Sequence, residues 1–219
     1  MIFAKIDFIN LLPFYVFIKK NVSSSQQKQI LNYKKSYPSL INKQFVKRRI
    51  DAAFISSVAS QKTKSLDIGI VAKNEVLSVL SLRGNDEKDY QSDTSNALAQ
   101  VLGVKGKVFI GDKALQYYHN STNKDFVDLA QVWKERYNLP FVFARLCYNK
   151  NDKVLKNMTK GFLQTKIKIP QYILKQYTKR SGLSASQIQE YLTKISYDIS
   201  YKEKRSLKLF FKLIQEKGI

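Results

Sequence analysis

The sequence predicts an α/β protein of two lobes around a central cleft, followed by a helical C-terminal tail. Short β-rich runs alternate with segments of helical periodicity up to about residue 150, which is the pattern of an α/β fold. The pattern closes near residue 82, starts again and returns near residue 145, which indicates two strands crossing between lobes. We expect residues 1–82 with 150–219 to form one lobe and residues 83–149 the other, with crossings near 82 and 146. The cleft between them is the expected binding site.

The first stretch, Lys5–Phe14, is predicted to be a short buried strand that runs straight into a helix. Pro13 falls within the first helical turn, where a missing N–H is tolerated. The polar amide of Asn10 stands at the junction, and strand ends of this kind hold the ligands of open α/β folds. Taken alone, Asn10 is explained equally well as a helix cap, so both interpretations stay open at this point.

The remaining elements of the first half follow from periodicity and turn signals. A helix over residues 39–48 is expected to begin at Ser39 as its N-cap and to bury Leu40, Ile41, Phe45 and Val46. The other predicted elements are a helix over Pro13–Lys20, a weak strand around Gln29–Tyr33, and strands at Ile50–Ile55, Ile68–Ala72 and Val76–Leu82.

The second half repeats the alternation and then becomes helical. Ser92–Ser95 precedes a helix over Asn96–Leu102 that Gly103 ends. Further along we expect a strand at Lys107–Ile110, a helix from Lys113, a helix over Phe126–Tyr137 and a strand at Phe141–Leu146. No strand is predicted beyond Lys150, only helices at about Asp152–Leu163, Pro170–Ser181, Ser184–Ile195 and Lys202–Gly218, the last two with capping pairs Ser184/Gln187 and Ser200/Glu203.

The charge is extreme, with 38 Lys and Arg against 17 Asp and Glu and a formal net charge of +21. The basic residues are nevertheless scattered through every segment, and the motifs of nucleic-acid-binding folds are missing. Nucleic acid is therefore not the expected partner. A positive field of this size would steer small polyanions into a cleft.

The single cysteine, Cys147, excludes a disulfide within the chain and is expected to be a small buried side chain on a strand. The single histidine, His119, has no second ligand at metal-binding spacing, so neither a metal site nor a histidine triad is expected. No run approaches ~20 apolar residues, and the apolar start lacks the basic region of a secretory signal. These features predict a cytoplasmic protein.

Short polar groups recur where predicted strands give way to helices: Asn10; Ser56 and Ser57; Thr94 and Ser95; Gly111 and Asp112. The N–H groups of a helix N-terminus lack partners and bind carboxylates and phosphates. Each junction alone is better explained as a plain N-cap, whereas all four around one cleft would form an anion site. Phosphate-binding loops and Ser, Cys or His nucleophile motifs are absent. An enzyme with this inventory would depend on orientation, neutral hydrogen bonding and the acidity of its substrate.

Several segments over residues 5–145, in the same order along the chain, resemble the menaquinone-biosynthesis chorismate dehydratases of the futalosine pathway. The matching segments are Ile6–Phe14, Asp51–Ser57, Ser78–Leu82, Asp93–Leu98, Ile110–Leu115, Asp128–Trp133 and Leu139–Ala144. The sequence departs from the family pattern at Tyr137-Asn138 and at Leu146-Cys147, where the second crossing is expected.

The resemblance implies a type II periplasmic-binding-protein-like fold and a carbon–oxygen lyase that converts chorismate to 3-[(1-carboxyvinyl)oxy]benzoate and water, with no cofactor and no metal. It implies a catalytic role for Asn10 and substrate binding by Ser56, Ser57, Ser78, Thr94, Ser95, Gly111 and Asp112. A related lyase of the same pathway uses a histidine base, but His119 lies in no matching motif. A non-catalytic small-anion-binding protein of the same fold is the other alternative.

Overall fold

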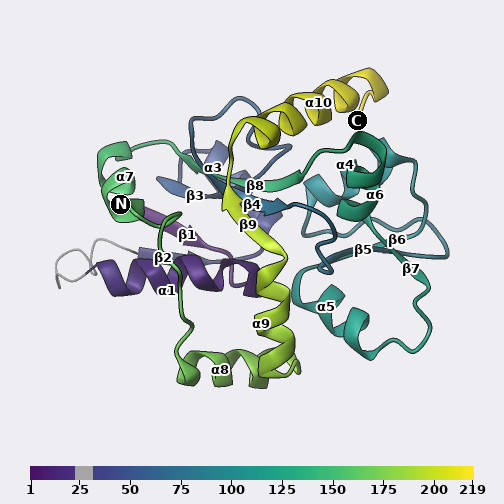
Figure 1. The fold of residues 1–219 in the computed structure, drawn as a ribbon. Coiled ribbons are helices and arrows are strands. Elements are labelled where there is room, and N and C mark those ends of the chain that lie inside the picture. The colour runs from purple at the N-terminus through teal and green to yellow at the C-terminus, as the bar shows by residue number, and fades with distance from the viewer. Residues whose placement is uncertain (23–31) are drawn as a thin grey trace.

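The structure is a computed structural model that describes residues 1–22 and 32–219. Its larger sheet has six strands in the order β2-β1-β3-β8-β4-β9. The first three pair in parallel, whereas β8 runs antiparallel to β3 and β4, and β9 runs antiparallel to β4 (Figure 1). The strands are β1 (Ile2–Lys5), β2 (Asn32–Lys35), β3 (Ala52–Ser56), β4 (Ser65–Ala72), β8 (Phe141–Tyr148) and β9 (Ile195–Asp198).

The smaller sheet has three antiparallel strands in the order β6-β5-β7. They are β5 (Val79–Leu82), β6 (Lys107–Ile110) and β7 (Phe126–Asp128). The chain therefore passes to the smaller sheet between β4 and β5 and returns before β8. The expected lobe limits, with crossings near 82 and 146, remain a prediction, and sheet membership favours placing each crossing a few residues earlier.

Ten-residue α1 (Leu12–Asn21) shows why the first helix forms where it does. Pro13 occupies its first turn, and Phe14, Phe17 and Ile18 lie on one buried face. The ring of Phe14 lies 4.9 Å from that of Phe54 in β3 and makes an edge contact, so the helix packs against the larger sheet.

The other helices flank the two sheets and continue into the tail (Figure 1). The tail's longest helix, α10, contacts both β8 of the larger sheet and α4 of the smaller lobe. The helices are α3 (Pro38–Val46), α4 (Asp93–Leu102), α5 (Gly111–Asn120), α6 (Leu129–Tyr137), α7 (Asp152–Thr159), α8 (Gln171–Ser181), α9 (Ala185–Thr193) and α10 (Tyr201–Lys217).

An aromatic cluster holds the tail against the second crossing. Trp133 of α6 is fully buried, with its ring 5.2 Å from Phe141 of β8 and 5.8 Å from Phe210 of α10. Its indole N–H donates to the Ser206 hydroxyl at 3.0 Å. The buried polar atom is thereby satisfied, and the tail becomes part of the core.

Two predictions about short strands were wrong. The segment predicted as a helix over Phe126–Tyr137 begins as β7, and α6 starts only after Asp128, whose carboxylate accepts from the N–H groups of Ala130 and Gln131. No strand was expected after Lys150, yet β9 pairs with β4, and the preceding helix stops at Thr193. Whether a segment of three or four residues forms a strand depends on the strands it pairs with, and the periodicity of the segment itself does not show that pairing.

Other boundaries differ because of specific contacts. The first strand ends at Lys5, and Asn10 lies in a 3₁₀ turn, η1 (Ile9–Leu11), rather than directly at a strand end. Helix α3 begins at Pro38, so Ser39 is not its cap and instead donates to the Tyr90 carbonyl. Val46, predicted to be buried, is 66% exposed.

Several predictions about element ends are confirmed. Gly103 ends α4 in the left-handed region, and both tail capping boxes form, at Ser184/Gln187 and at Ser200/Glu203. Of the weak strand predicted around Gln29–Tyr33, residues 29–31 lie outside the described residues, and β2 follows them.

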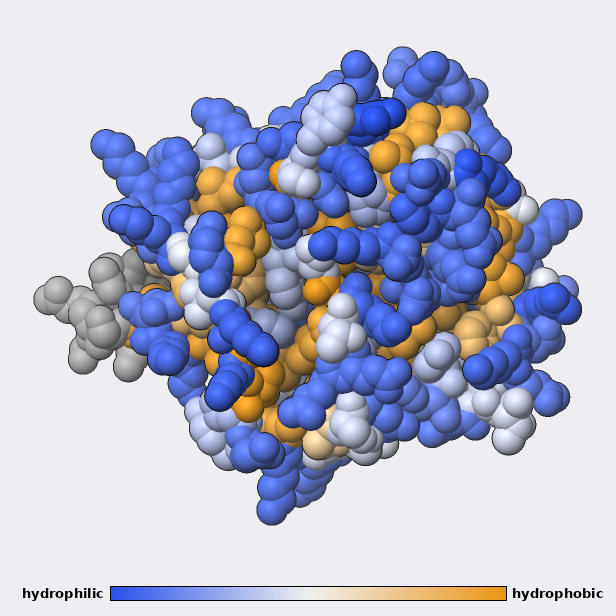
Figure 2. Space-filling view, viewed as in Figure 1, coloured by the Kyte–Doolittle hydropathy of each residue, from blue (hydrophilic) through white to orange (hydrophobic). Residues whose placement is uncertain are grey.

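Hydrophilic residues cover most of the face seen in Figure 2, with apolar residues in the hollows between them. Within residues 1–22 and 32–219, no helix is both long and apolar enough to cross a membrane.

Candidate active site

A cavity of about 70 Å³ lies where the two sheets face each other. Five of the eight predicted site residues line it: Asn10, Ser56, Ser78, Ser95 and Gly111. They come from η1, the end of β3, the residue before β5, and the first turns of α4 and α5. The rest of the lining is largely apolar and includes Phe8, Leu11, Phe54, Ile70, Ile110 and Phe143. The polar junctions predicted from separate parts of the chain thus meet at one place.

Asn10 contributes an unsatisfied acceptor. Its side-chain Oδ1 is buried and has no hydrogen-bond partner within the described part of the chain. Its main-chain carbonyl, in contrast, accepts from the Tyr197 hydroxyl at 2.7 Å. An orphaned buried polar atom is costly, so its presence in a cavity indicates a place for a donor from a ligand.

The Ser56 hydroxyl is oriented by Asn42, a residue that lies at none of the predicted strand-to-helix junctions. Asn42 Nδ2 donates to Ser56 Oγ at 2.7 Å, and Asn42 Oδ1 accepts from Ser56 N at 3.2 Å. Asn42 lies in α3 and is 3% exposed. Its position between the apolar residues Ile41 and Phe45 was the available signal, because a buried amide inside a helix needs partners.

The polar residues at the N-terminus of α4 have two roles: some line the cavity, and others bond to neighbouring segments. Ser92 caps the helix by accepting from Ser95 N at 3.1 Å, and it also donates to Ser95 Oγ at 2.8 Å. Both serines line the cavity. Thr94 and Ser57 do not line it: Thr94 Oγ1 accepts from Val58 N at 3.1 Å, and Ser57 Oγ donates to the Val142 carbonyl. These two hydroxyls hold the walls together.

Gly111 opens α5 at the cavity with a φ of +65° and donates its N–H to the Ser78 carbonyl at 2.8 Å. A Cβ at this position would lie 3.0 Å from the ring of Phe8, which lines the same cavity. Glycine is therefore required for both backbone conformation and the approach of Phe8. Helix α5 has no side-chain cap, and Asp112 places a carboxylate in its first turn.

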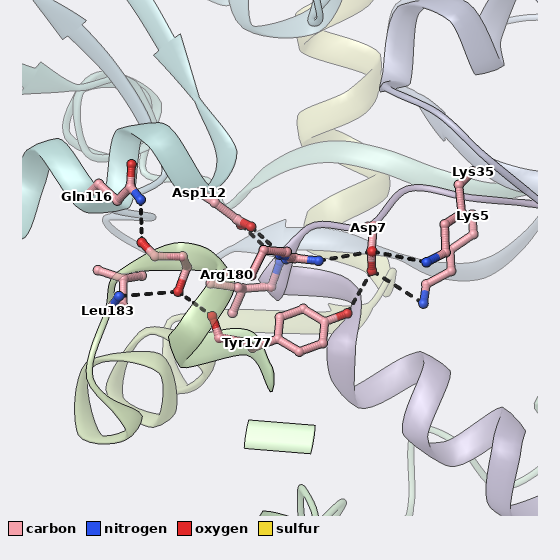
Figure 3. Close-up of polar contacts among 10 residues, drawn as sticks. Lys5, Asp7, Lys35, Asp112, Gln116, Tyr177, Arg180 and Leu183 are labelled. Carbon is pink, nitrogen blue, oxygen red and sulfur yellow. Dashed lines mark hydrogen bonds and ion pairs between the residues drawn. The ribbon is translucent and has the colours of Figure 1, made fainter. Parts of the chain in front are cut away.

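Asp112 does not line the cavity; it participates in a bridge between lobes (Figure 3). Its Oδ1 accepts from Ile9 N at 3.1 Å, and its Oδ2 lies 2.8 Å from Nη2 of Arg180 in α8. The other guanidinium nitrogen, Nη1, lies 3.0 Å from Asp7 Oδ2. Arg180 thus joins the segment that follows β1 to the start of α5. We call Asp7, Arg180 and Asp112 the arginine bridge.

The two carboxylates of the arginine bridge are in different electrostatic environments. Burial raises the pKa of Asp7, but the Tyr177 hydroxyl, which donates to it at 2.8 Å, and nearby Lys and Arg cations lower the pKa to about 2. Burial raises the pKa of Asp112 above its usual value despite the Ile9 N–H and Arg180. The more accessible Asp7 is thus the firmly ionised partner.

The tail also supplies Tyr191 of α9, which is 1% exposed. Its hydroxyl donates to Ser78 Oγ at 2.8 Å, and burial raises its pKa above the usual value. No junction signal marked this residue in the sequence, where it appears only as an apolar position of a helix.

A larger groove of about 980 Å³ lies beside the tail, between residues 162–171 and the stretch from α9 to β9. None of the eight predicted site residues lines it, whereas Tyr197 does. The hydroxyl of Tyr197 reaches the Asn10 carbonyl, so this groove lies behind the η1 turn. We place the candidate site in the smaller cavity because the predicted polar groups converge there.

Within the described residues, no three His, Cys, Asp or Glu side chains are grouped as metal ligands. Cys147 is buried on β8, as predicted, where burial raises its pKa to about 11. His119 lies on α5 outside the cavity lining, and burial lowers its pKa.

Comparison with known proteins points to one family. A family model described as "Menaquinone biosynthesis" matches residues 84–216. A chorismate dehydratase of Campylobacter jejuni is 48% identical over 216 residues, which is 97% of this chain and 96% of that protein.

Solved structures with low sequence identity share the fold. A protein of Archaeoglobus fulgidus aligns with a TM-score of 0.70 at 12% identity, covering 99% of this chain and 97% of that one. A Candida albicans gene product, described as having the generic periplasmic binding protein fold, aligns with a TM-score of 0.51 at 12% identity, covering 99% and 94%. These structures show that the fold is periplasmic-binding-protein-like, as predicted.

Proposed function

The chain belongs to the menaquinone-biosynthesis family, and from that premise we propose that it is a chorismate dehydratase. The reaction converts chorismate to 3-[(1-carboxyvinyl)oxy]benzoate and water, which makes the enzyme a carbon–oxygen lyase. The relative named chorismate dehydratase covers nearly the whole chain and supports this assignment. We place the reaction in the cavity that holds Asn10.

The observation that carries the mechanism is the neutrality of this cavity. Its polar lining residues are Asn10, Ser56, Ser78, Ser92 and Ser95, and no Asp, Glu, His, Lys or Arg is among the described residues that line it. Such a site supplies orientation and hydrogen bonds rather than a general base, because neither an amide nor a hydroxyl is appreciably basic.

Chorismate suits such a site because it carries its own driving force. The proton on the ring carbon that bears the ether is acidified by conjugation with the ring carboxylate. Loss of this proton and of the neighbouring hydroxyl makes the ring aromatic. The enolpyruvyl carboxylate of the substrate can take the proton and deliver it to the departing hydroxyl, so that both leave as water.

In this proposal the enzyme holds two carboxylates and orients the hydroxyl. Helices α4 and α5 both begin at the cavity, so the positive ends of their dipoles face the bound carboxylates, while Asp93 and Asp112 of the same first turns bond or point elsewhere than into the lining. Ser56 and Ser95 add hydroxyl donors, and Asn10 contacts the reacting region. The predicted roles of Ser57, Thr94 and Asp112 become supporting ones, since their polar groups bond to neighbouring segments.

The cavity volume favours an opening motion. About 70 Å³ is below the roughly 300–1,000 Å³ of typical small-molecule sites. The arginine bridge closes one side of the cleft, and bonds from Ser39 to Tyr90 and Gln91 close the other. We infer that chorismate enters when the lobes part, about crossings between β4 and β5 and between α6 and β8.

The direct test is incubation of the purified protein with chorismate. We expect growth of aromatic absorbance and a product lighter by one water, with Asn10→Ala prepared in parallel as the control. Chorismate that binds and is recovered unchanged would instead identify a non-catalytic anion-binding protein. The related lyase with a histidine base is disfavoured because His119 lies outside the cavity lining.

A further inference from the structure

Three serine hydroxyls that line the cavity each accept a hydrogen bond from another side chain, at 2.7 Å for the first and 2.8 Å for the other two. The pairs, with the donor first, are Asn42 to Ser56, Tyr191 to Ser78 and Ser92 to Ser95. A hydroxyl has one hydrogen, and none of the three accepting hydroxyls donates it to another group of the described residues. All three hydrogens are therefore available to a ligand.

The backbone fixes the direction of the bond from Asn42. The N–H of Ser56 can only donate, and it bonds to Asn42 Oδ1 at 3.2 Å. Oδ1 is therefore the acceptor end of the amide, and the atom 2.7 Å from Ser56 Oγ is the donor end, Nδ2. Nδ2 also lies 3.4 Å from Asp93 Oδ2 in α4, where a carboxylate favours a donor. Reversing the Asn42 amide would lose all of these bonds.

This direction determines what Ser56 presents to a ligand. Asn42 occupies one lone pair of the Ser56 hydroxyl, so the hydroxyl hydrogen must be directed away from Asn42. Because Ser56 lines the cavity, a ligand there can accept this hydrogen. A carboxylate is the strongest acceptor for it, since a hydrogen bond to an ionised group is shorter and stronger than one between neutral groups.

We propose that Asn42 is a positioning residue that commits the Ser56 hydroxyl to donate to a carboxylate of the substrate. This inference rests on the proposed function and deepens it, because it assigns one of the two chorismate carboxylates to the Ser56 side of the cavity. Asn42 lies in α3 of the larger lobe and Asp93 in α4 of the smaller one, so the amide is held from both lobes. A ligand with a hydroxyl or amine donor in place of that carboxylate would lose the bond from Ser56.

The test is a double-mutant cycle with Asn42→Asp and Ser56→Ala, measuring kcat and KM for chorismate. Asn42→Asp keeps an acceptor for Ser56 N but replaces Nδ2 by an oxygen, so the Ser56 hydroxyl would donate to the new carboxylate instead of the substrate. We expect KM to rise about 10-fold with kcat within about 3-fold, because the lost bond serves the ground state and the transition state alike. Ser56→Ala alone should raise KM by a similar factor.

In the Ser56→Ala background, Asn42→Asp should raise KM less than about 3-fold, since only the effect of its charge remains. Asn96→Asp is the matched control. Asn96 makes the same two-ended contact with the backbone of Asp89, accepting from its N–H at 2.9 Å and donating to its carbonyl at 2.7 Å, but it does not line the cavity. Its KM should stay within about 2-fold of the wild-type value, because solvent screens the added charge.

Three kinetic outcomes would overturn the proposal: an unchanged KM in Asn42→Asp, an unchanged KM in Ser56→Ala, or an equal rise for Asn42→Asp with and without Ser56. If Asn42→Asp does not fold, neutron diffraction from wild-type crystals exchanged into D₂O decides. We expect a deuterium of Asn42 Nδ2 directed at Ser56 Oγ; a Ser56 hydroxyl deuterium directed at Asn42 would refute the inference. This measurement needs no chorismate, so it separates failure of this inference from failure of the proposed function.

Discussion

Arg180 and Asp112 form an ion pair of 2.8 Å that fastens the tail to the smaller lobe at the first turn of α5. The same guanidinium holds Asp7 of the larger lobe at 3.0 Å (Figure 3). A planar guanidinium can serve two carboxylates at once, which a lysine ammonium does less well. The arginine bridge is therefore suited to hold the closed arrangement of the lobes.

Arg180→Ala should raise KM for chorismate about 5-fold. Because the Arg180 side chain is 38% exposed and its charge is screened by solvent, loss of its ion pairs should destabilise the closed arrangement by about 1 kcal/mol. Arg180→Lys should recover only part of this loss. The exposed Arg205, which lies over the Tyr201 ring, provides a control in Arg205→Ala. An unchanged KM, together with unchanged compactness in small-angle scattering, would show that the bridge does not govern closure.

Asp7→Asn should destabilise the protein by about 2 kcal/mol at pH 7 and by about half as much at pH 3. The folded pKa of Asp7 is about 2, below its ordinary value of 3.8. Its contribution is therefore complete above the unfolded pKa and is lost as the pH falls through the folded pKa. Urea unfolding at several pH values measures the difference. Asp152→Asn, which removes an exposed i,i+4 pair with Lys156, should show no measurable loss at either pH. A loss for Asp7→Asn that did not change with pH would contradict the assignment.

Gly111→Ala and Gly103→Ala form a matched pair, because their φ angles are +65° and +64°. Both substitutions should cost about 1 kcal/mol of stability through backbone strain. At Gly103 nothing lies within 4 Å of the added Cβ, whereas at Gly111 the Phe8 ring lies at 3.0 Å. Only Gly111→Ala should also reduce chorismate turnover, by displacing Phe8. Equal turnover in the two variants would show that the position of Phe8 does not affect the reaction.

Asn10→Ala should lower kcat roughly 100-fold, the usual loss for one oriented hydrogen-bonding group at a reacting centre. Asn10→Asp should also be inactive at pH 7, because a third carboxylate would repel the two of the substrate. The like charges of the substrate raise the pKa of the new carboxyl. The activity of Asn10→Asp should therefore partly return as the pH is lowered from 8 to 5 and that carboxyl becomes protonated. A rate for Asn10→Asp independent of pH would argue against a neutral group at this position.

The alternation of strands and helices could be predicted from the sequence, whereas short strands that form only through pairing with neighbouring strands could not. The Phe126–Asp128 and Ile195–Asp198 segments are short and lack a clear period of two, and their pairing with β5 and β4 decides their conformation. The longer apolar runs, such as the fully buried β3, were recognisable because their composition alone favours a strand.

For the site, polar residues at strand-to-helix junctions could be found from the sequence, but their direction could not. Ser56 and Ser57 are adjacent, yet only Ser56 lines the cavity, whereas the Ser57 hydroxyl bonds to the β8 backbone. Tyr191 and Arg180 were missed because they belong to tail helices, where the pattern reports only a buried or an exposed face. Their contribution depends on how the tail folds back onto both lobes.

The pairing of β9 with β4 has a consequence for synthesis of the protein on the ribosome. Ala72 pairs with Ile195, so one edge of β4 stays uncovered while the smaller lobe and the first tail helices are translated. An uncovered strand edge is a template for association with other chains. A nascent chain released before Ile195 would lack both that cover and the Tyr197 support of Asn10. Premature termination in this region should therefore yield an aggregating product rather than a weakly active one.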